Sequence, residues 1–361
     1  MKSNKQTDLK SKATDAHELD HGIVVTSRVR LARNVKPFAF PGWLKKNERI
    51  AALARIQEAV VQLVQMQPMS INQTLDQFTP LEKQLLVEQH LISREHAAKN
   101  IGSGLVVNSS QTLSVMINEE DHLRLQSIQS GFQLSETWQA VDEVDTDLEA
   151  NLDFAYSSSL GYLTACPTNV GTGMRASAML HLPGLVLSDQ INQVIKSVNQ
   201  IGLAVRGLYG EGTEALGNLF QISNQVTLGE SEQQILDRLN KVIRQLVEHE
   251  QNAREKLLQE KGRAVADQLG RAYGTMLYAY SMSSKEALNL LSLLKLGVDM
   301  QVLPASLRKK IDQLFISTQP AHLQKASGRK LTAEERDAFR ADFLRQELKS
   351  MPTVSMNKLQ L

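Results

Sequence analysis

The pattern of apolar residues changes near residue 229, and this change constrains the fold more than any other feature of the sequence. Between residues 101 and 222, short apolar runs typical of strands alternate with helical stretches. Beyond residue 229, capping patterns stand ahead of apolar residues at helical spacing. We therefore expect an α+β fold, with helices flanking a mostly antiparallel sheet, followed by a helical C-terminal domain. The expected boundaries are a polar lead-in over 1–22, the sheet domain over 23–240 and the helical domain over 241–361.

Local patterns place individual elements within these domains. Helical spacing of apolar residues predicts helices over 47–66, 81–92, 121–128, 135–149, 175–182 and 188–199. Short β-branched or apolar runs predict strands over 23–25, 105–107, 113–117, 160–165, 201–205 and 218–222. In the last third, Ser231, Ser283 and Thr332 each precede Gln or Glu by three residues, which is typical of a helix N-terminus. Gly297 is expected to end the second of these helices.

Composition excludes several classes of protein. A hydrophobic content of 42% in 361 residues is enough for a substantial core. A net charge of +1 argues against bulk binding of nucleic acid or of an acidic membrane surface. The single cysteine permits neither an internal disulfide nor a cysteine-based zinc site, and it is typical of a cytoplasmic protein. No apolar run reaches about 18 residues and no apolar segment marks a secretory signal, so we expect no membrane association.

The first charged cluster is the segment 26–34, Thr-Ser-Arg-Val-Arg-Leu-Ala-Arg-Asn. If this segment is extended, Arg28 and Arg30 point to the same face, because strand side chains alternate. Two guanidinium groups side by side suit a phosphate, which arginine binds with two parallel hydrogen bonds. A solvated edge strand is the alternative, and the segment alone does not decide between them.

The second cluster places three consecutive carboxylates, Glu119, Glu120 and Asp121, directly after an apolar run. Such carboxylates repel one another unless a cation lies among them, and a metal ion, a lysine or a guanidinium substrate would each serve. The alternative is a helix N-terminus, where the helix dipole favours acidic residues.

The third cluster is the stretch 166–177, which holds the only cysteine, two glycines and an arginine. Cys166 in a cationic turn is a candidate chemical group, although free cysteines are commonly small buried hydrophobic residues. Residues 171–176 fit the G-x-G-x-x-A pattern of dinucleotide-binding folds. We reject that fold, because residues 167–169 separate the pattern from the preceding apolar run and no βαβ unit surrounds it.

Two further clusters complete the set. The glycine-rich segment 205–214 carries Arg206 and Glu211 but lacks the Walker pattern of P-loop NTPases. On the last predicted helix, Arg336 and Arg340 lie one turn apart and repel each other by about 0.2–0.5 kcal/mol unless an anion binds between them. An ordinary surface turn and a solvated helix face, respectively, are the alternatives.

Together, the motifs resemble those of the guanidino (phosphagen) kinases, the family that contains creatine and arginine kinases. The segments T-S-R-V-R-L-A-R-N, N-E-E-D-H-L-R, C-P-T-N-V-G-T-G-M-R-A-S and R-G-L-Y-G-E-G occur in this order over roughly residues 23–227. Phosphagen kinases carry a longer helical domain ahead of the first arginine motif, and here only residues 1–25 precede it. The motif R-D-x-x-R-A over 336–341 is similar to that of the family's bacterial protein-arginine kinases, in which the acceptor is an arginine side chain of a protein.

The resemblance implies an enzyme that uses ATP, with Mg²⁺ carried largely by the phosphates and no metal ligand from the protein. Several arginines would grip the phosphates, and a histidine would lie near the base. The nucleotide-binding residues implied are Ser27, Arg28, Val29, Arg30, His90, Arg124, Arg175, Ala176, Ser177, Ala178, Met179, Arg206, Gly207, Leu208, Tyr209, Gly210 and Glu211.

The resemblance also implies how the acceptor guanidinium is bound. Glu120 and Glu211 match the two glutamates of the family that contact the substrate, and they would orient it and take its proton. Glu119 and Asp121 would add negative field. Cys166 matches the family's reactive cysteine and would act as an auxiliary thiolate rather than as a covalent nucleophile.

In the protein-arginine kinases, the C-terminal motif implies a regulatory pocket for phosphoarginine, formed here by Arg336, Asp337, Arg340 and Ala341. The implied partners are protein substrates that present arginine, including a heat-shock repressor, an activating zinc-finger protein, and a Clp-type ATPase and protease that degrades marked proteins under stress. A homodimer or higher oligomer in the cytoplasm, without direct binding to nucleic acid or membrane, is expected. The alternatives are a kinase of free arginine or another small guanidine, and a non-catalytic phosphoarginine-binding adaptor.

Overall fold

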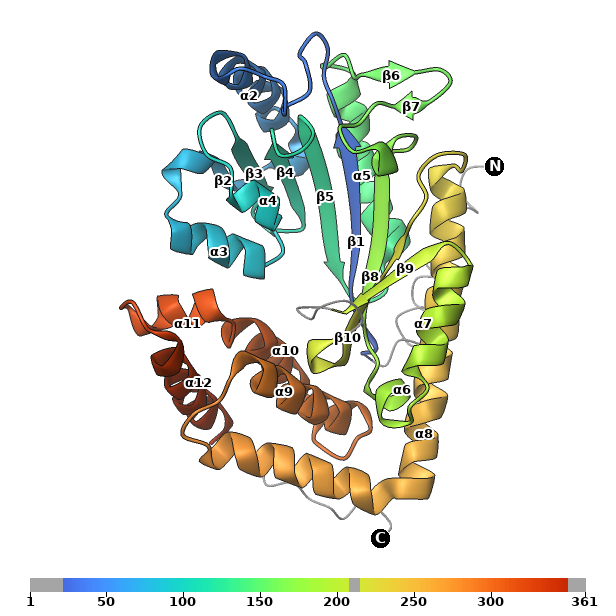
Figure 1. The fold of residues 1–361 in the computed structure, drawn as a ribbon, viewed down its shortest axis with the longest axis vertical. Coiled ribbons are helices and arrows are strands. Elements are labelled where there is room, and N and C mark those ends of the chain that lie inside the picture. Colours follow the sequence, from blue (N-terminus) through green and yellow to red (C-terminus); the bar gives the residue numbers. More distant parts are fainter. Residues whose placement is uncertain (1–21, 208–214, 350–361) are drawn as a thin grey trace.

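The chain folds into a sheet part and a helical part, which the computed structural model describes over residues 22–207 and 215–349. In Figure 1 a twisted sheet with helices packed on it forms one half of the molecule, and helices coloured orange to red form the other. One long helix, α8 (Glu232–Tyr278), runs along both parts. The predicted α+β class, with a mostly antiparallel sheet, flanking helices and a helical C-terminal region, is confirmed.

Within the described residues, eight strands form one sheet in the order β2-β3-β4-β5-β1-β8-β10-β9. Every neighbouring pair in this sheet is antiparallel. The strands are β1 (Val24–Arg33), β2 (Met69–Thr74), β3 (Gly104–Asn108), β4 (Leu113–Ile117), β5 (Leu123–Ser130), β8 (Met174–His181), β9 (Leu203–Gly207) and β10 (Leu219–Asn224). A separate hairpin pairs β6 (Tyr156–Ser157) with β7 (Gly161–Tyr162). The longest strand, β1, therefore lies in the interior of the sheet between β5 and β8.

The two faces of this sheet are covered differently. On one face, α2 (Lys46–Val61), α5 (Leu134–Glu149) and the first half of α8 enclose the main core, to which β1 contributes Val29 and Leu31. On the other face, α3 (Pro80–Glu88) and α4 (Arg94–Ala97) pack over β3 and β4 around a smaller core. Because side chains of a strand alternate between the faces, the second face of β1, β5 and β8 is where their polar side chains project.

The remaining helices connect the sheet to the C-terminal part and build a core of their own. They are α6 (Pro183–Leu187), α7 (Ile191–Gln200), α9 (Ser284–Asp299), α10 (Arg308–Ser317), α11 (Pro320–Ser327) and α12 (Ala333–Leu348). The end of α8 packs with α9, α10 and α12 around Leu291, Ile311 and Leu344. Helix α11 packs against α3 of the sheet part. In the described ranges, no helix is both long and apolar enough to cross a membrane.

Helix α8 passes through the expected domain boundary at 240/241 without interruption. Ile235 and Ala253, in the first half of the helix, belong to the core of the sheet part, whereas Ala272 and Met276 belong to the C-terminal core. Its backbone leaves helical geometry at Lys261, with φ −134° and ψ 25°. We therefore propose that the two parts meet at this kink rather than at residue 240.

The predicted helix starts are confirmed, and two predicted helices are wrong. Ser231, Ser283 and Thr332 each accept a hydrogen bond from the backbone N–H three residues on, at the start of α8, α9 and α12. Residues 121–128 and 175–182, predicted as helices, lie instead largely in β5 and β8. The first error arose because the acidic residues ahead of the segment suggested a helix N-terminus. The second arose because the segment combines good helix formers with apolar residues.

Two smaller predictions also differ from the structure. Gly297 does not end α9, which continues to Asp299. A Cβ at Gly297 would lie 3.0 Å from Leu303 and 3.2 Å from Leu269, so the glycine serves close packing inside the helix. Strand β2 was not predicted, because its sequence Met-Ser-Ile-Asn-Gln-Thr is mostly polar and it lies at the edge of the sheet.

Candidate active site

One face of the central sheet carries a row of arginines. Arg28 and Arg30 lie on β1, Arg175 of β8 pairs with Arg30, and Arg124 of β5 pairs with the β1 residue Ala32. Farther out, Arg206 of β9 pairs with Gln221 of β10, whose side-chain oxygen accepts a hydrogen bond from Arg28 at 2.7 Å. Paired residues of antiparallel strands share a face. The side chains of Arg28, Arg30, Arg124, Arg175 and Arg206 therefore project together, and they are called the arginine face below.

The positive charges on the arginine face repel one another, and this repulsion adds to burial in lowering the pKa values of three of its arginines. Burial, followed by repulsion from Arg124, lowers the pKa of Arg28 to about 10. Burial, with repulsion from Arg28 and Arg124, lowers the pKa of Arg30 well below its ordinary value. The Nε atom of Arg30 is shielded from solvent and has no hydrogen-bond partner. Burial and repulsion from Arg206 also lower the pKa of Arg175. A bound polyphosphate would satisfy the unpaired donor and turn this repulsion into attraction.

Glu119 is bound to the arginine face. Its buried carboxylate accepts hydrogen bonds from Arg124 at 2.5 and 2.7 Å and from the Ser93 hydroxyl. Burial by itself would raise the pKa of Glu119, but Arg124 and Ser93 together hold it below the ordinary value. Glu119 is therefore ionised and orients the guanidinium of Arg124.

Glu120 differs from its neighbours because it is exposed and lines the cleft described below. Partial burial and the negative charges of Asp121 and Glu119 raise the pKa of Glu120 above its ordinary value. A carboxylate with a raised pKa beside a row of cations is suited to accept a proton from a bound cationic ligand.

Asp121 connects three segments beneath the cleft. Its carboxylate accepts hydrogen bonds from the Asn34 side chain at 2.7 Å and from the Ala165 backbone at 2.6 Å. The side-chain oxygen of Asn34 in turn accepts a hydrogen bond from the backbone N–H of His122 at 2.9 Å. These bonds fix the segment that carries Cys166 against the end of β1, so Asp121 is a positioning residue.

Cys166 stands at the entrance to a short 3₁₀ turn (Pro167–Asn169) and lines the cleft. Its Sγ lies 3.0 Å from the Thr168 hydroxyl, which lies 3.4 Å from a terminal nitrogen of Arg175. The residue is half-buried rather than packed into a core. The alternative of a buried structural cysteine is therefore wrong.

Gly171 and Gly173 shape the turn between Cys166 and β8. Their φ angles are 111° and 64°, in the region that favours glycine. A Cβ on Gly173 would lie 2.7 Å from the carbonyl oxygen of Ala32, and one on Gly171 would lie 2.2 Å from that of Thr227. The turn thus closes tightly against β1 and brings Arg175 onto the arginine face. Because the glycine pattern leads into a strand rather than a helix, it supports our rejection of a dinucleotide-binding fold.

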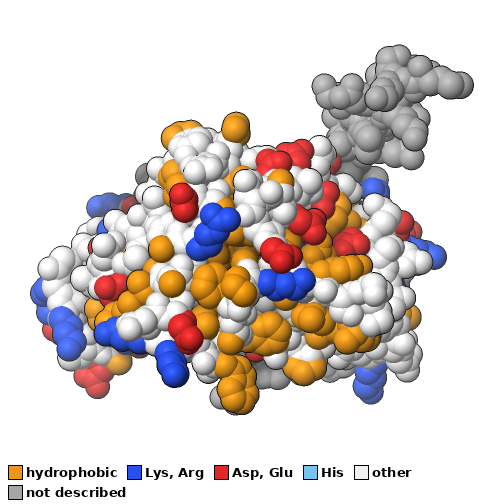
Figure 2. Space-filling model, turned by 90° about the horizontal axis from the view of Figure 1, so that it is seen from above, with side chains coloured by type: hydrophobic (Ala, Val, Ile, Leu, Met, Phe, Trp, Pro, Cys, Tyr) orange, Lys and Arg blue, Asp and Glu red, His pale blue; other side chains and the backbone are white. Residues whose placement is uncertain are grey.

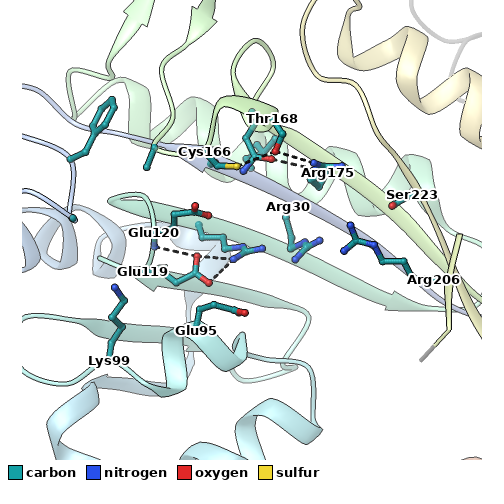
Figure 3. Close-up of a pocket in the computed structure, with 18 of the residues that line it drawn as sticks. Arg30, Glu95, Lys99, Glu119, Glu120, Cys166, Thr168, Arg175, Arg206 and Ser223 are labelled. Carbon is teal, nitrogen blue, oxygen red and sulfur yellow. Dashed lines mark hydrogen bonds and ion pairs between the residues drawn. The ribbon is translucent and has the colours of Figure 1, made fainter. Parts of the chain in front are cut away.

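Four arginines of the face, Glu120 and Cys166 line one cleft with a volume of about 810 Å³. In Figure 3, Arg206 and Arg175 lie toward one end of this cleft, and Glu120, Glu119 and Lys99 lie toward the other. The cleft is also lined by residues that the sequence did not point to: Phe40, Trp43, Glu95, Lys99, Thr168, Asn169, Gln221 and Ser223. These residues come from separate segments, so no local sequence pattern predicts that they lie together. Gln221 is an exception, because the strand alternation that places the arginines on this face also places Gln221 there.

The residues predicted to contact the nucleotide beside these arginines divide between the two faces of the sheet. Ser177 and Met179 of β8 pair with Arg28 and Thr26, so they lie on the arginine face. The side chains on the opposite, buried face belong to Ser27, Val29, Ala176 and Ala178. A nucleotide contact from these four residues is therefore limited to their backbone.

His90 lies beside the arginine face at the end of the α3 segment. Its backbone has φ 60°, and its carbonyl oxygen accepts a hydrogen bond from the Gln126 side chain at 2.8 Å. Burial and the charge of Arg28 lower the pKa of His90 to about 4. A neutral imidazole at this position is compatible with the predicted contact to a nucleotide base.

One predicted segment is described only in part. Gly207 is the last residue of β9. The other members of this segment that were predicted to bind nucleotide or acceptor lie outside the described residues: Leu208, Tyr209, Gly210 and Glu211.

The predicted phosphoarginine pocket on α12 is partly filled by the protein itself. Arg336 and Arg340 lie one turn apart, as predicted. Arg340, however, is 1% exposed and donates hydrogen bonds to the carbonyls of Thr318 and Met282, to Ser284 and to Asp337. Ala341 is part of the C-terminal core. The more open member of the pair is Arg336, which donates to the Leu331 carbonyl at 3.4 Å, so a phosphoarginine site there stays a prediction.

Comparison with protein families gives two matches along the chain. A family described as ATP:guanido phosphotransferase, C-terminal catalytic domain, matches residues 52–253. A family described as Protein-arginine kinase McsB C-terminal domain matches residues 262–359. The interval between the two matches contains the α8 kink at Lys261.

Individual proteins show the same similarity. A protein named Protein-arginine kinase from Pelotomaculum thermopropionicum is 44% identical over 340 residues, covering 94% of this chain and 96% of that protein. One of the same name from Shouchella clausii is 45% identical over 341 residues, covering 91% and 92%. Among solved structures, a lombricine kinase matches with a TM-score of 0.56 at 26% identity, covering 64% of this chain and 67% of the other. A duplicated taurocyamine kinase from Schistosoma mansoni matches with a TM-score of 0.58 at 27% identity, covering 72% and 40%.

Proposed function

This chain belongs to the ATP:guanido phosphotransferase family, and on that premise we propose that it transfers the γ-phosphoryl group of ATP to arginine side chains of proteins. The proposal rests mainly on the arrangement of one cleft. Cations suited to the phosphates of the donor line one end, and an exposed glutamate with a raised pKa lines the other. The similarity to curated protein-arginine kinases over more than nine-tenths of the chain supports a protein rather than a small guanidine as the acceptor.

The arginine face supplies what a triphosphate needs. Phosphoryl transfer depends mainly on aligning the reactants and on stabilising the charge of the transferred oxygens. Arg30 offers a buried donor without a partner, and Arg124 is oriented by Glu119 before any ligand arrives. Because these charges are already held in place by the sheet, little reorganisation is needed when ATP binds.

The acceptor end must activate a guanidinium, which is protonated and a poor nucleophile. In the proposed step, a terminal nitrogen of the acceptor attacks the γ-phosphorus, an N–P bond forms, and the bond to the β–γ bridging oxygen breaks to leave ADP. The proton released from that nitrogen passes to the Glu120 carboxylate. A general base placed in this way accelerates the reaction by about 10²–10⁴-fold. Glu211, outside the described residues, is proposed as a second carboxylate, and the Cys166 thiolate as an auxiliary negative charge.

Mg²⁺ is proposed to enter with the nucleotide. Among residues 22–207 and 215–349, no group of three histidine, cysteine or acidic side chains is placed to hold a metal ion. Phosphate oxygens and water commonly carry Mg²⁺ in kinases, where the ion neutralises charge on the transferred group.

The biological setting follows from the family resemblance alone. We propose that the modified proteins, including a heat-shock repressor, are marked for a Clp-type ATPase and protease under stress. An activating zinc-finger partner, a homodimer or higher oligomer, a cytoplasmic location and a regulatory phosphoarginine pocket at Arg336 are proposed on the same basis.

Incubation with γ-labelled ATP and Mg²⁺ tests the proposal. The acceptors are an unfolded protein such as casein, free arginine and a buffer blank, each with the unaltered protein and with Glu120→Gln. We expect acid-labile label on the protein acceptor that depends on Glu120. Faster labelling of free arginine would identify a small-guanidine kinase instead, and binding of phosphoarginine without turnover would identify an adaptor.

A further inference from the structure

A short aromatic loop stands at the acceptor end of the cleft and has no role in the chemistry above. The loop spans residues 36–44, between β1 and α2, and its residues Phe40, Gly42 and Trp43 line the same cleft as Glu120 and Cys166. Trp43 is 85% exposed, the largest exposed fraction among the large hydrophobic residues of the described chain. Figure 2 looks down on the end of the molecule that carries α2, where apolar side chains lie at the surface among acidic and basic ones.

The base of this loop is fixed to the acidic segment. The backbone N–H of Val35 donates to Nδ1 of His122 at 3.1 Å, and the Phe38 ring packs edge-on against the His122 ring with centroids 5.9 Å apart. His122 follows Asp121 and Glu120 directly in the chain. These contacts therefore fix the position of the loop relative to Glu120, the carboxylate proposed to bind the acceptor.

The tip of the loop is held as firmly as its base. Pro41 and Leu44 are buried on either side of Gly42 and Trp43, and the backbone N–H of Trp43 donates to the Phe40 carbonyl at 2.8 Å. Buried neighbours on both sides and the backbone hydrogen bond to Phe40 therefore fix the Trp43 backbone, while its indole is exposed to solvent. Tryptophan is enriched among the residues that contribute most to binding a partner, because it buries a large area with few rotatable bonds.

We propose that Phe40 and Trp43 dock the polypeptide on either side of the acceptor arginine, by binding an apolar or aromatic side chain close to it in sequence. The inference rests on the proposed function and names a substrate preference for the same cleft. A protein cannot place a guanidinium at Glu120 without bringing its backbone to the cleft, and Phe40, Gly42 and Trp43 of the aromatic loop line that cleft. The acidic residues Glu95 and Glu120 on the same lining complement the arginine's charge, while the loop supplies the apolar contact that free arginine could not use.

Two peptides test this, each with a single arginine, one flanked by leucine and tryptophan and the other by glycine and serine. Loss of a well-packed tryptophan contact weakens binding by about 10–30-fold or more. We expect Trp43→Ala to raise KM for the apolar peptide by about that factor, with kcat for that peptide and KM for ATP within twofold of the unaltered protein. The glycine-serine peptide should be affected less than threefold. Tyr278→Ala, which removes an aromatic side chain that is 78% exposed in the C-terminal part, is the matched control and should change neither peptide.

Fluorescence gives a readout that does not require turnover. Trp138→Phe removes the other tryptophan, so titration with the apolar peptide should shift the emission of Trp43 to shorter wavelength at a concentration matching KM. Equal effects of Trp43→Ala on both peptides, a changed KM for ATP, or an emission that does not respond would each overturn the inference. If the unaltered protein phosphorylates neither peptide nor any protein acceptor, the proposed function itself fails; phosphorylation of both peptides without any dependence on Trp43 refutes the docking loop alone.

Discussion

Replacing Arg30 by methionine should make the protein more stable and yet weaken its binding of ATP. Arg30 carries a guanidinium whose pKa is strongly lowered by burial and by repulsion from Arg28 and Arg124, and its Nε has no partner. Methionine keeps much of the length of the side chain but removes the charge and the unpaired donor. The change therefore removes an unfavourable buried charge and unpaired donor from the ligand-free protein, and it removes a favourable contact from the nucleotide complex.

The magnitudes follow from the same geometry. A buried donor without a partner costs about 1–3 kcal/mol, so Arg30→Met should raise the free energy of unfolding by about that amount. A hydrogen bond to a charged group contributes about 1.5–3 kcal/mol, so the dissociation constant for ATP should rise about 10–150-fold.

Arg33 on the same strand is the matched control, because the opposite sign is expected there. Its guanidinium is 1% exposed, pairs with Asp145 at 2.7 Å and stacks over the Tyr162 ring at 3.5 Å. Arg33→Met leaves the buried carboxylate of Asp145 unpaired, which should cost about 3–5 kcal/mol. Chemical denaturation without nucleotide and calorimetric titration with ATP measure both variants. If Arg30→Met destabilises the protein as much as Arg33→Met does, or binds ATP as tightly as the unaltered protein, the description of the arginine face is wrong.

Four further predictions concern the acceptor end and the contact between the two parts of the chain. Glu120→Gln should reduce kcat by about 10²–10⁴-fold while ATP titration stays unchanged. The pKa of Glu120 is raised, and only the ionised carboxylate can accept a proton. The kcat of the unaltered protein should therefore be maximal above that pKa and fall as the pH drops through it, at a higher pH than for an ordinary glutamate. A pH profile without this fall would contradict the role of Glu120 as a base. Cys166→Ser should slow phosphorylation without abolishing it, as steady-state kinetics would show, whereas a loss as complete as that of Glu120→Gln would make the cysteine central to the mechanism. Glu88 accepts hydrogen bonds from the backbone N–H groups of Ala321 and His322 and from the His322 ring. Glu88→Ala should therefore speed hydrogen exchange of these two amides about 5–30-fold, which corresponds to a loss of about 1–2 kcal/mol of local stability. Unchanged exchange would show that the contact contributes nothing to stability.

Sequence periodicity was enough to predict part of the site. Alternation along an extended segment placed Arg28 and Arg30 on one face, and β1 has that geometry. The same rule would have placed Arg124 there, since Leu123 and Leu125 are buried on either side of it. The acidic residues that precede the segment favoured a helix and hid this signal.

Other parts of the site could not be predicted from local patterns. Strand β8 carries Ala176 and Ala178 on its buried face, and short good helix formers give no strand signal, so the pairing of Arg175 with Arg30 was not foreseen. The repulsion between Arg336 and Arg340 suggested an anion site, but charge spacing does not reveal that Arg340 is satisfied by carbonyls from distant segments. Such contacts depend on tertiary packing.

Mass spectrometry of an acceptor protein, under conditions that preserve N–P bonds, tests the central claim most directly. After incubation with ATP and Mg²⁺, we predict phosphoryl groups localised on arginine side chains with the unaltered protein and their near absence with Glu120→Gln. Phosphorylation confined to serine, threonine or tyrosine, or phosphoarginine formed equally well by Glu120→Gln, would contradict the account.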